Sequence, residues 1–575
     1  MDLPLGELET PARSSMTMTT PCEVRELHES NATGNDVNKC TTLGGEMGEV
    51  EDLPGQPGAS IQGRPPMLTS GVAEISFILV CSAGQYFFSH LLGNCAVLQD
   101  VITDMFHMPA SQRVWPNGAY NLANGLGVPL SGALADIYGA RILIVASLGW
   151  LTIACILGAA VGTRSSIAFM VIRALQGLGV SGMTSSSISY LGRVYKPGKR
   201  KTAVFSGMAS LAPIGYVVGA IQGGALSKSK TAVAWMFGSN ALIVGIIFLA
   251  ALKYAPSEQT VRQYERLTGA PAVPRRKFDW IGAVVAVAAC GLLIFGLTQG
   301  SAAHWAPYTY STIIAAVFLF ALFVFIESKV ADPLVPNSIW KTKGFLPVAS
   351  AYFLSFGCFS AYQFYAITFW LRIQGKTPLV AGLYLIPNAF IGVLATFLVA
   401  RLFHIMPGHL ILGAGCVASA LGPVFFLTQH PATTYWALSF PGIAISTFAP
   451  DLSFAAAAIF LTTHCSRRYQ GVAGSLLITL QNLSSAIVTS TSESIGTAVE
   501  QHHLSVLSVP KQFRNVGNNG TTWMGPEHSL VTGRGTTLQQ LHTIWWFDIS
   551  GSLLGIIVAA LFLRVPKATE SDHIE

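Results

Sequence analysis

Two stretches, Gly132-Ala-Leu-Ala-Asp136-Ile-Tyr-Gly139-Ala-Arg141 and Arg173-Ala-Leu-Gln176-Gly177-Leu-Gly179, decide how this chain folds. The first lies between two apolar segments of membrane-spanning length, and the second lies inside the segment that follows them. Ionisable groups in or beside hydrocarbon are costly and are rarely kept without a use. We therefore expect both stretches to belong to the working part of a membrane protein.

The composition agrees with a protein that crosses the membrane many times. Of the 575 residues 51% are hydrophobic and 11% are charged, whereas soluble proteins carry about 25% charged residues. The apolar runs are continuous, which excludes a transmembrane barrel and predicts an all-α membrane protein. A helix needs about 20 residues to span the bilayer. We predict fourteen transmembrane helices, at 72–96, 114–135, 142–161, 166–190, 203–224, 233–252, 280–299, 309–327, 345–370, 379–400, 409–428, 434–461, 471–493 and 544–564.

The distribution of Lys and Arg predicts the orientation, because cytosolic loops carry the excess of these residues. With the N-terminus in the cytosol, 24 of the 34 fall inside, nine fall outside and Arg173 lies in the membrane. An even number of spans returns the C-terminus to the cytosol. The net charge of +6 is thus explained by topology, and we expect no nucleic-acid partner. The predicted location is the plasma membrane, with the vacuolar membrane as the alternative.

Residues outside the spans suggest little further chemistry. None of the nine cysteines falls in the long outer loop 500–541, so we expect no disulfide framework. That loop contains Asn519 in a glycosylation sequon, which we rate as equally compatible with a chance match. Gly375-Lys376-Thr377 imitates the end of a phosphate loop, but Trp370 stands where the first glycine is required. We see no H-E-x-x-H metal pair and expect no enzyme, no metal and no cofactor.

A weak internal repeat predicts the domain organisation. The run Leu398-Val-Ala-Arg401-Leu-Phe-His404 follows the tenth span much as the first motif follows the second span. Two pseudo-symmetric six-helix halves with an inserted helix pair, a 6+2+6 arrangement, would explain it. The predicted parts are a disordered cytosolic tail 1–70, an N-terminal half 71–254, a basic cytosolic linker 255–278, the inserted pair with its following loop 279–344, a C-terminal half 345–565 and a cytosolic tail 566–575.

These motifs resemble those of the major facilitator superfamily. Gly132 to Arg141 is similar to its loop signature, Arg173 to Gly179 is similar to its fourth-helix signature, and fourteen spans resemble its drug:proton antiporter branch. Leu191-Gly-Arg-Val-Tyr-Lys-Pro-Gly-Lys-Arg-Lys201 and Phe448-Ala-Pro-Asp451-Leu-Ser-Phe454 resemble fungal aminotriazole-resistance and boron-efflux transporters. The resemblance covers roughly residues 70 to 565.

The first motif offers a cytosolic latch formed by Gly132, Asp136, Gly139 and Arg141. Gly139 permits a bend, and Asp136 can cap a helix or pair with a cation across the interface between the halves. Such a latch would break when the cavity opens toward the cytosol. The alternative is that the motif only anchors the loop on the cytosolic side of the membrane. Ile137 and Ala140 replace positions that are often basic in the family, so this latch should hold fewer charge contacts.

Two groups inside the membrane are candidates for proton coupling. Arg173 lies too deep to reach water easily and needs a carboxylate, carbonyl groups or water as its partner; the resemblance implies a role in coupling, against a structural tie. Asp451 follows Pro450 and is, on the predicted boundaries, the carboxylate nearest the middle of any span. Exposed to each side in turn, it could load and release a proton, or it could satisfy backbone groups freed at a proline kink.

The first span departs from the resemblance, since many antiporters of this branch carry an Asp there. This chain has Ser82-Ala-Gly-Gln85-Tyr86-Phe-Phe-Ser89-His90 instead. His90 could titrate, but we favour a hydrogen-bonded packing histidine. In the fifth span, Pro213, Gly215 and Gly219 resemble a degraded antiporter signature and predict either a gating bend or tight helix packing.

Polar uncharged side chains follow the helical repeat in three spans and should face the interior. We predict a substrate cavity lined by Gln85, Asn117, Asn121, Asn124, Gln481 and Asn482, with hydrogen bonding between helices as the alternative. Such a lining suits a neutral or weakly polar organic molecule.

The leading hypothesis is a monomeric, proton-driven exporter of a small molecule, such as a toxin, drug or secondary metabolite, that works by alternating access. Export of boric acid or another small neutral solute, facilitated uptake and a non-transporting membrane sensor remain alternatives.

Overall fold

The computed structural model describes residues 65, 67–68, 70–108, 112–195, 199–257, 259–261, 263, 279–303, 305–330, 342, 344–464, 470–506, 523–524, 530–531 and 538–562. All of them belong to the unit formed by residues Ser60–Glu575. Most of the predicted tails and of the basic linker lie outside these residues.

The N-terminal part of the chain forms a bundle of long helices. In chain order these are α1 (Gly71–Val97), the short α2 (Gln99–Phe106), α3 (Trp115–Tyr138), α4 (Ala140–Val161), α5 (Ser166–Val194), α6 (Lys199–Leu226) and α7 (Ala232–Tyr254). Their ends follow local sequence signals. Ser70 and Ser165 accept hydrogen bonds from the amides of Ala73 and Ala168, which caps α1 and α5. Gly139, at φ 99°, makes the turn between α3 and α4.

The rest of the chain forms a helix pair and a second bundle. The pair consists of α9 (Trp280–Ala302) and α10 (Pro307–Glu327). The bundle contains α12 (Phe345–Thr368), the π-helix η2 (Phe369–Ile373), α13 (Pro378–Tyr384), α14 (Ile386–Ile405), α15 (Gly408–Leu427), the π-helix η3 (Tyr435–Ser439), α16 (Phe440–Ser446), α17 (Phe448–His464), α18 (Gln470–Val506) and α20 (Leu538–Phe562). A two-stranded antiparallel sheet, β1 (Trp523–Met524) with β2 (Leu530–Val531), lies between α18 and α20 in sequence.

The predicted all-α membrane fold is confirmed, but the count of fourteen spans remains a prediction. Among the described residues, 12 helical segments are long and apolar enough to cross a membrane. The predicted second and thirteenth spans are helices, α3 and α18, but neither is among the 12. Their amide and hydroxyl side chains lower their hydropathy, because both helices present polar groups to the bundle interior.

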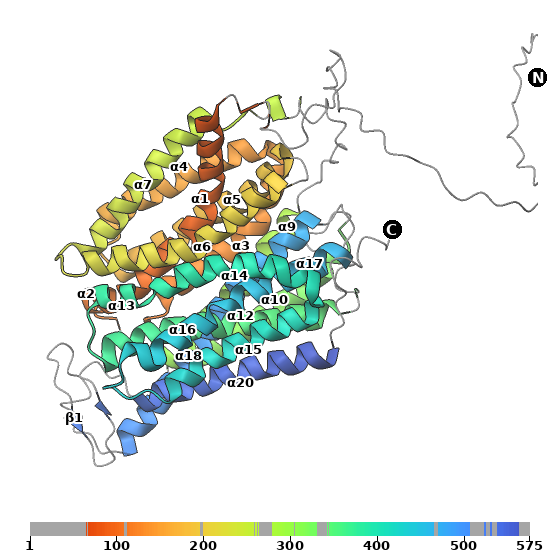
Figure 1. Ribbon diagram of the computed structural model, residues 1–575. Helices are drawn as coiled ribbons and strands as arrows, with labels where there is room; N and C mark the ends of the chain where they lie inside the picture. The colour runs from red at the N-terminus through yellow and green to blue at the C-terminus, as the bar shows by residue number, and fades with distance from the viewer. Residues whose placement is uncertain are drawn as a thin grey trace, which may run out of the picture. The chain divides into compact units, whose positions relative to one another are not determined.

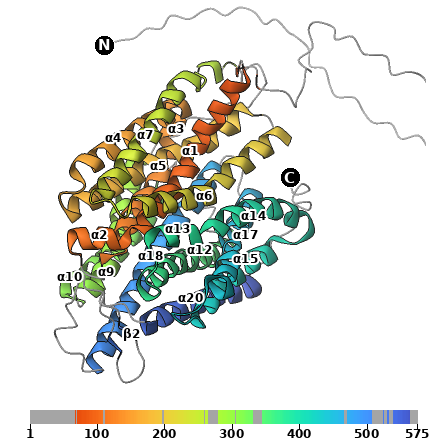
Figure 2. The same cartoon turned by 60° about the vertical axis from the view of Figure 1, so that its left-hand side comes forward.

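Corresponding helices of the two bundles pack in corresponding pairs. In the first bundle α1 packs on α6, α3 on α5, and α4 on both α5 and α7. In the second, α12 packs on α18, α14 on α17, and α15 on both α17 and α20. The contacts between bundles are paired as well, since α3 meets α18 and α6 meets α14. Figures 1 and 2 show α1–α7 gathered on one side of these contacts and α12–α20 on the other.

The helix pair α9 and α10 lies against the seam between the two bundles. Helix α9 packs on both α18 and α3. The Ser494 hydroxyl of α18 donates to the Leu297 carbonyl of α9 at 3.1 Å, and the rings of Trp115 and Phe295 pack 6.1 Å apart. The pair therefore covers one side of the α3–α18 contact.

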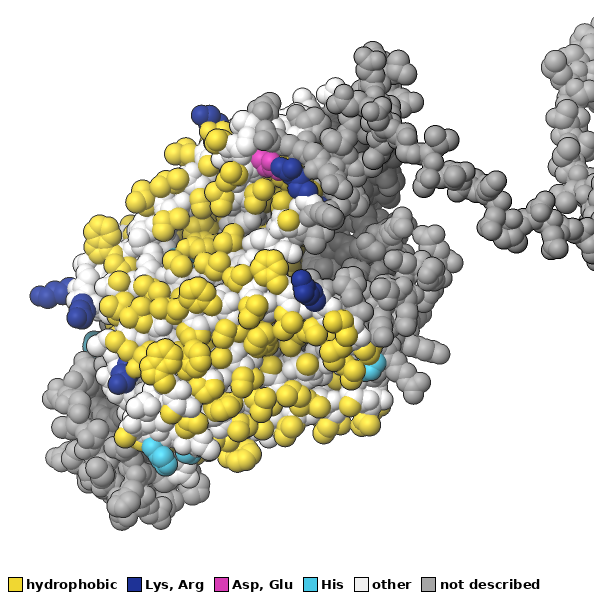
Figure 3. Space-filling view, viewed as in Figure 1, with side chains coloured by type: hydrophobic (Ala, Val, Ile, Leu, Met, Phe, Trp, Pro, Cys, Tyr) yellow, Lys and Arg dark blue, Asp and Glu magenta, His cyan; other side chains and the backbone are white. Residues whose placement is uncertain are grey.

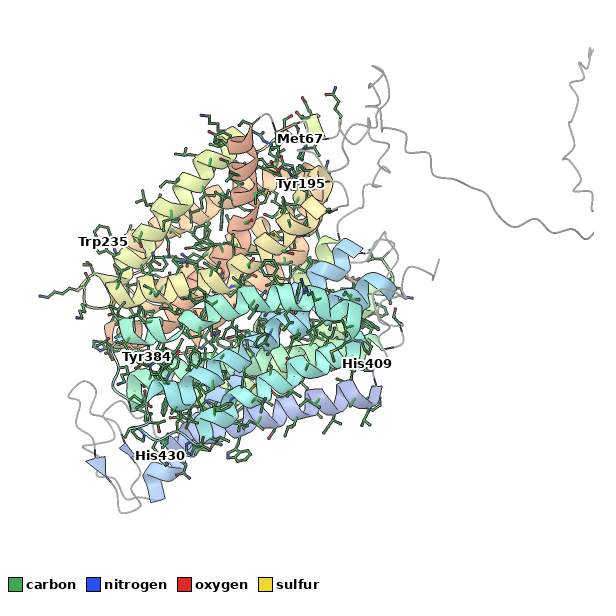
Figure 4. All side chains as sticks on the ribbon, viewed as in Figure 1. Met67, Tyr195, Trp235, Tyr384, His409 and His430 are labelled. Atoms are coloured by element: carbon green, nitrogen blue, oxygen red, sulfur yellow. The ribbon has the colours of Figure 1, made fainter. Side chains whose placement is uncertain are left out.

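The surface of the described helices suits a lipid environment. Large hydrophobic side chains such as Trp235, Ile314 and Phe390 are exposed, and the face shown in Figure 3 is covered with hydrophobic groups, with Lys and Arg mostly near its margins. In Figure 4, Tyr195 and His409 lie toward one end of the helices, and Trp235, Tyr384 and His430 lie toward the other. We call the second end the outer end, because the charge count predicts that it faces away from the cytosol.

Candidate functional site: a cavity between the two bundles

A cavity of about 210 Å³ lies between the two bundles. Helices α1, α3, α5 and α6 contribute one wall, and α12, α14, α17 and α18 contribute the other. Its lining residues are Gln85, Phe88, Ser89, Leu92, Asn121, Asn124, Thr184, Ala209, Ala212, Pro213, Tyr216, Phe356, Phe359, Ser360, Gln363, Asn388, Thr447, Pro450, Asp451, Phe454, Ile478, Gln481, Asn482 and Ser485. This lining combines uncharged polar groups with aromatic rings and contains one carboxyl group.

Asp451 is that carboxyl group. The predicted twelfth span is broken at Thr447, between α16 and α17, and Asp451 lies in the first turn of α17 directly after Pro450. Pro450 fits there because the first amides of a helix have no partner inside the helix. Among the described residues, no hydrogen bond or ion pair involves the Asp451 side chain. The break thus exposes the carboxyl to the cavity.

An aromatic group stands beside Asp451 on the same wall. The Phe356 and Phe359 rings of α12 pack 6.2 Å apart, and Tyr352 contacts Phe356 and Phe454 with ring centres 6.2 and 6.3 Å away. Phe454 lies one turn after Asp451 on α17. The cavity therefore offers an apolar, aromatic surface next to its acid, which suits organic molecules with a ring or a hydrocarbon part.

Five of the six residues predicted to line the cavity do so: Gln85, Asn121, Asn124, Gln481 and Asn482. Several also join helices. Asn121 donates to the Ser485 hydroxyl at 3.0 Å across the two bundles, Asn124 donates to the Gly177 carbonyl at 3.2 Å, and Gln481 accepts from Tyr352 at 3.2 Å. The contribution of these residues to substrate binding remains a prediction.

Asn117 lies elsewhere. It lines a second cavity of about 60 Å³, which shares Leu92, Asn121, Tyr216, Ser360, Gln363 and Ser485 with the first. Its side-chain oxygen also accepts from Arg173 at 3.2 Å. The second cavity therefore continues the first along α3 and α18.

Arg173 is completely buried and is held mainly by oxygen acceptors. Its guanidinium donates to the Pro116 carbonyl at 3.1 Å, the Leu91 carbonyl at 2.9 Å and the Gln176 side chain at 2.9 Å. The Tyr120 ring lies 4.7 Å from the guanidinium carbon. We predicted a carboxylate, carbonyl groups or water as the partner of Arg173. The structure shows carbonyl groups, together with two side-chain amides and an aromatic ring. These contacts tie α5 to α1 and α3 inside one bundle.

The rest of the fourth-helix motif serves close packing. The Gln176 amide donates to the Cys155 sulfur at 3.1 Å. A Cβ at Gly177 would overlap the Tyr120 carbonyl oxygen of α3, and one at Gly179 would lie 3.1 Å from Leu151 and Trp150 of α4. The two glycines let α5 approach both neighbours.

The fifth-helix motif also packs closely, with its proline inside an unbroken α6. Cβ atoms at Gly215 and Gly219 would overlap the backbone oxygens of Tyr86 and His90 on α1. Pro213 lines the cavity and also stands where a Cβ on Gly392 of α14 would fall. A role of this segment as a gating bend remains a prediction.

His90 is a packing histidine in this structure. It is buried, its Nε2 pairs with Asn240 Oδ1 at 3.0 Å, and its ring stacks on Tyr86. These contacts lie inside the N-terminal bundle.

The predicted latch is only partly described. Arg141 donates to the carbonyls of Ala255 and Leu252 at 3.0 and 3.5 Å, which ties it to the end of α7 in its own bundle. A Cβ at Gly132 would meet no atom within 4 Å. The side chains of Asp136 and His404 lie outside the described residues, and so does Asn519. The latch therefore stays a prediction.

The sequence reasoning missed two buried ion pairs that join the bundles toward the outer end. Asp100, on α2, pairs with Arg372 of η2 at 2.6 Å. Arg113, which precedes α3, pairs with Glu493 of α18 at 3.2 Å. Arg113 and Arg372 lie just outside the ends of predicted spans and were therefore counted as loop residues. Both acids are buried, and a charged residue in an apolar run indicates a functional or paired site.

Asp548 corrects the prediction that Asp451 is the most central carboxyl. Helix α20 begins at Leu538, six residues before the predicted start, so Asp548 lies about as far from the ends of its span as Asp451 does. It is also completely buried. The start of α20 was not predicted, because the polar residues Gln539, Gln540 and His542 in its first turns interrupt the apolar pattern.

Comparison with known proteins identifies the architecture. A sequence profile of the Major Facilitator Superfamily matches residues 76–489. The chain belongs to this superfamily. Its members are transporters, so this superfamily protein is a multi-pass membrane transporter of small molecules, and the resemblance inferred from its motifs is confirmed.

Relatives of this superfamily protein carry several transport names. It is 30% identical to the efflux pump terJ of Aspergillus terreus over 76% of this chain and 84% of that protein. It is 28% identical to a low affinity ammonium transporter of Saccharomyces cerevisiae, over 85% of this chain and 88% of the relative. It is also 26% identical to the aminotriazole resistance protein of the same yeast, over 74% and 78%.

A solved structure with the same fold is a D-xylose-proton symporter. Its TM-score to this superfamily protein is 0.54 at 14% identity, with 86% of this chain and 98% of the symporter covered. At this identity the likeness concerns the fold alone.

Proposed function

We propose that this transporter exports a small organic molecule from the cytosol in exchange for protons, by alternating access. The observation that carries the proposal is Asp451, a carboxyl without a described partner in the wall of a cavity between two bundles. A group of this kind can hold a proton when one side is open and release it when the other side is open. The efflux name of the relative terJ supports the direction of transport.

The contacts between the bundles fit one state of such a cycle. The ion pairs Asp100–Arg372 and Arg113–Glu493 lie toward the outer end. Further in, the Thr479 hydroxyl of α18 donates to the Gly125 carbonyl at 2.9 Å, near the middle of α3. We interpret the arrangement as outer end closed, because both ion pairs lie on the outer side of the central cavity.

The lining indicates the substrate class. Among the described lining residues there is one acid and no Lys, Arg or His. An anion would meet Asp451 without a compensating cation, which disfavours anionic substrates. Amides and hydroxyls opposite aromatic rings suit a neutral or weakly polar molecule that makes a few hydrogen bonds.

Two experiments test this function. Metabolite profiling of cells with and without the gene identifies compounds that accumulate when the transporter is missing, with boric acid added to the test panel. Each candidate is then offered to proteoliposomes in which the cytosolic face of the protein points outward. An acidic lumen should drive the compound inward against its own gradient, and a protonophore should abolish this accumulation.

Facilitated uptake is the second candidate, because one relative bears the name of an ammonium transporter. In the same vesicles an uncoupled carrier would equilibrate its substrate and would not accumulate it when the pH gradient is imposed. Equal final concentrations with and without the gradient would favour this candidate. No flux of any compound in the panel would contradict both transport readings.

A further inference from the structure

Three ionisable side chains are buried together beside the outer part of the seam: Arg113, Glu493 and Asp548. Arg113 and Glu493 each expose 1% of the side chain, and Asp548 exposes none. Arg113 belongs to the N-terminal bundle, whereas Glu493 on α18 and Asp548 on α20 belong to the C-terminal bundle. None of the three lines the central cavity.

Glu493 is compensated in this structure. Its Oε1 lies 3.2 Å from Nη2 of Arg113, and its Oε2 accepts the Tyr365 hydroxyl at 2.6 Å. One cation and one anion with a hydrogen bond on each carboxylate oxygen make a buried pair that is electrically neutral.

Asp548 has no such compensation. By hydrogen-bond geometry neither of its carboxyl oxygens is paired among the described residues; the Ser492 hydroxyl is placed to donate to this carboxyl and bonds to no other group. An ionised carboxylate in this position would be buried without a counter-charge, which is prohibitively costly. Asp548 must therefore carry a proton while Arg113 is engaged by Glu493.

The two acids belong to one cluster. Ser492 and Glu493 are neighbours on α18, and Tyr365 of α12 interacts electrostatically with Glu493, Arg113 and Asp548. The other titratable groups on the described parts of the elements packed around Asp548 are Cys358, Tyr352 and Tyr362 on α12, Cys416 and His409 on α15, His542 on α20 itself, and Arg372 of η2, which is paired with Asp100. Arg113 is thus the cation in contact with the cluster.

We propose that Glu493 and Asp548 form a second proton-binding site whose occupancy is set by Arg113. With the outer end closed, the two acids hold one proton and Arg113 balances the remaining charge. When the bundles separate at the outer end, Arg113 moves away with α3 and leaves two buried acids without a cation. Glu493 then binds a proton from water on the outer side, and the site holds two.

Closure reverses this step. The O–H bond of Glu493 breaks, the proton passes to water, and Arg113 takes its place as the counter-charge of the carboxylate. The small second cavity offers a place for that water, because Thr489 and Ser490, one turn before Glu493 on α18, line it and it shares residues with the central cavity. One proton is therefore exchanged each time the outer end opens and closes.

This inference deepens the proposed proton coupling and rests on it, but its test needs no substrate. Spin labels at Lys230→Cys and Thr434→Cys, both exposed and following α6 and α15 at the outer end, report the separation of the bundles. Cys22, Cys40 and Cys465 are replaced by Ser. The distance is measured by electron–electron double resonance in nanodiscs over a series of pH values. Protons are the only ligand that is varied.

In the wild-type background, acidification should increase the population with the long outer distance, because a state that binds one more proton gains population as the pH falls. The double variant Glu493→Gln/Asp548→Asn, which mimics two protonated acids, should populate the long distance at every pH. The matched control Asp100→Asn removes the other ion pair; it should favour the long distance while keeping the pH response. If the double variant does not elute as a monodisperse peak, the single variant Glu493→Gln is expected to lose the response. Asp548→Asn, which mimics the proton that Asp548 holds in both states, is expected to keep it.

A pH response of the double variant equal to that of the wild-type background would overturn the proposal, and so would a wild-type distance that does not change with pH. Transport separates this failure from failure of the proposed function. Full proton-driven accumulation by the double variant would remove this site and leave the function standing. Absence of proton-driven accumulation in the wild type would remove the function itself.

Discussion

The guanidinium carbon of Arg173 lies 4.7 Å from the centre of the Tyr120 ring, while the same guanidinium donates to carbonyls of α1 and α3. An arginine can make these contacts together because its donors are fixed in a plane and its flat face can stack on a ring. The charge stays in the membrane because backbone oxygens and a π-face replace its hydration.

Arg173→Lys should therefore destabilise the protein even though it keeps the charge. An ammonium group cannot reach the Pro116 and Leu91 carbonyls and the Gln176 amide from one position, and each lost hydrogen bond to a charged group costs about 1.5–3 kcal/mol. We expect a lower melting temperature in detergent and loss of transport. The control is Arg164→Lys, in the exposed loop before α5, which should leave both unchanged. A variant with unaltered melting temperature and transport would show that these contacts contribute little.

Packing between α1 and α6 can be tested with two glycines of the same helix. Gly219→Ala places a methyl group where the His90 carbonyl oxygen stands, whereas a Cβ at Gly207 meets no atom within 4 Å. Overpacking costs about 1–3 kcal/mol, but Gly→Ala in an open helical position gains up to about 1 kcal/mol. Gly219→Ala should lower the melting temperature and Gly207→Ala should keep or raise it. Equal shifts in the two variants would contradict the close approach of the helices.

Gln85 tests the role of the cavity in recognition. It lines the cavity from α1, and truncation to Ala removes a hydrogen-bonding group worth about 0.5–1.5 kcal/mol, or roughly two- to tenfold in affinity. We expect a higher KM at an unchanged melting temperature. Thr152→Ala, which removes a hydroxyl bonded within α4, serves as the control and should not change KM. Identical KM values in both variants would place the substrate elsewhere.

Residues with periodic or motif signals were the ones that sequence could place. The polar stripe that contains Asn121 and Asn124 predicted an interior face, because lipid does not tolerate exposed amides, and the structure puts both in the cavity wall. Gly215 and Gly219 predicted a close approach from their four-residue spacing. Pro450 predicted a kink close to the break at Thr447, since proline removes a backbone hydrogen-bond donor from a helix.

The contacts between distant segments could not be read in the same way. Arg113 and Glu493 are 380 positions apart, and nothing local in either segment indicates that they meet. Asn117 shares the stripe of Asn121, yet it turns to Arg173, because the guanidinium competes with the cavity for its oxygen. Asp548 was overlooked because its helix begins with polar residues, so its depth in the membrane was underestimated.

The most direct test of the account compares wild-type protein with Asp451→Asn in oriented proteoliposomes, using a compound found by metabolite profiling. The amide keeps the shape of the side chain and cannot carry a proton. Exchange of labelled for unlabelled compound at equal pH should persist, which shows that the variant folds and binds. Accumulation driven by an acidic lumen should be lost. Full uphill accumulation by Asp451→Asn would contradict the claim that this carboxyl couples protons to export.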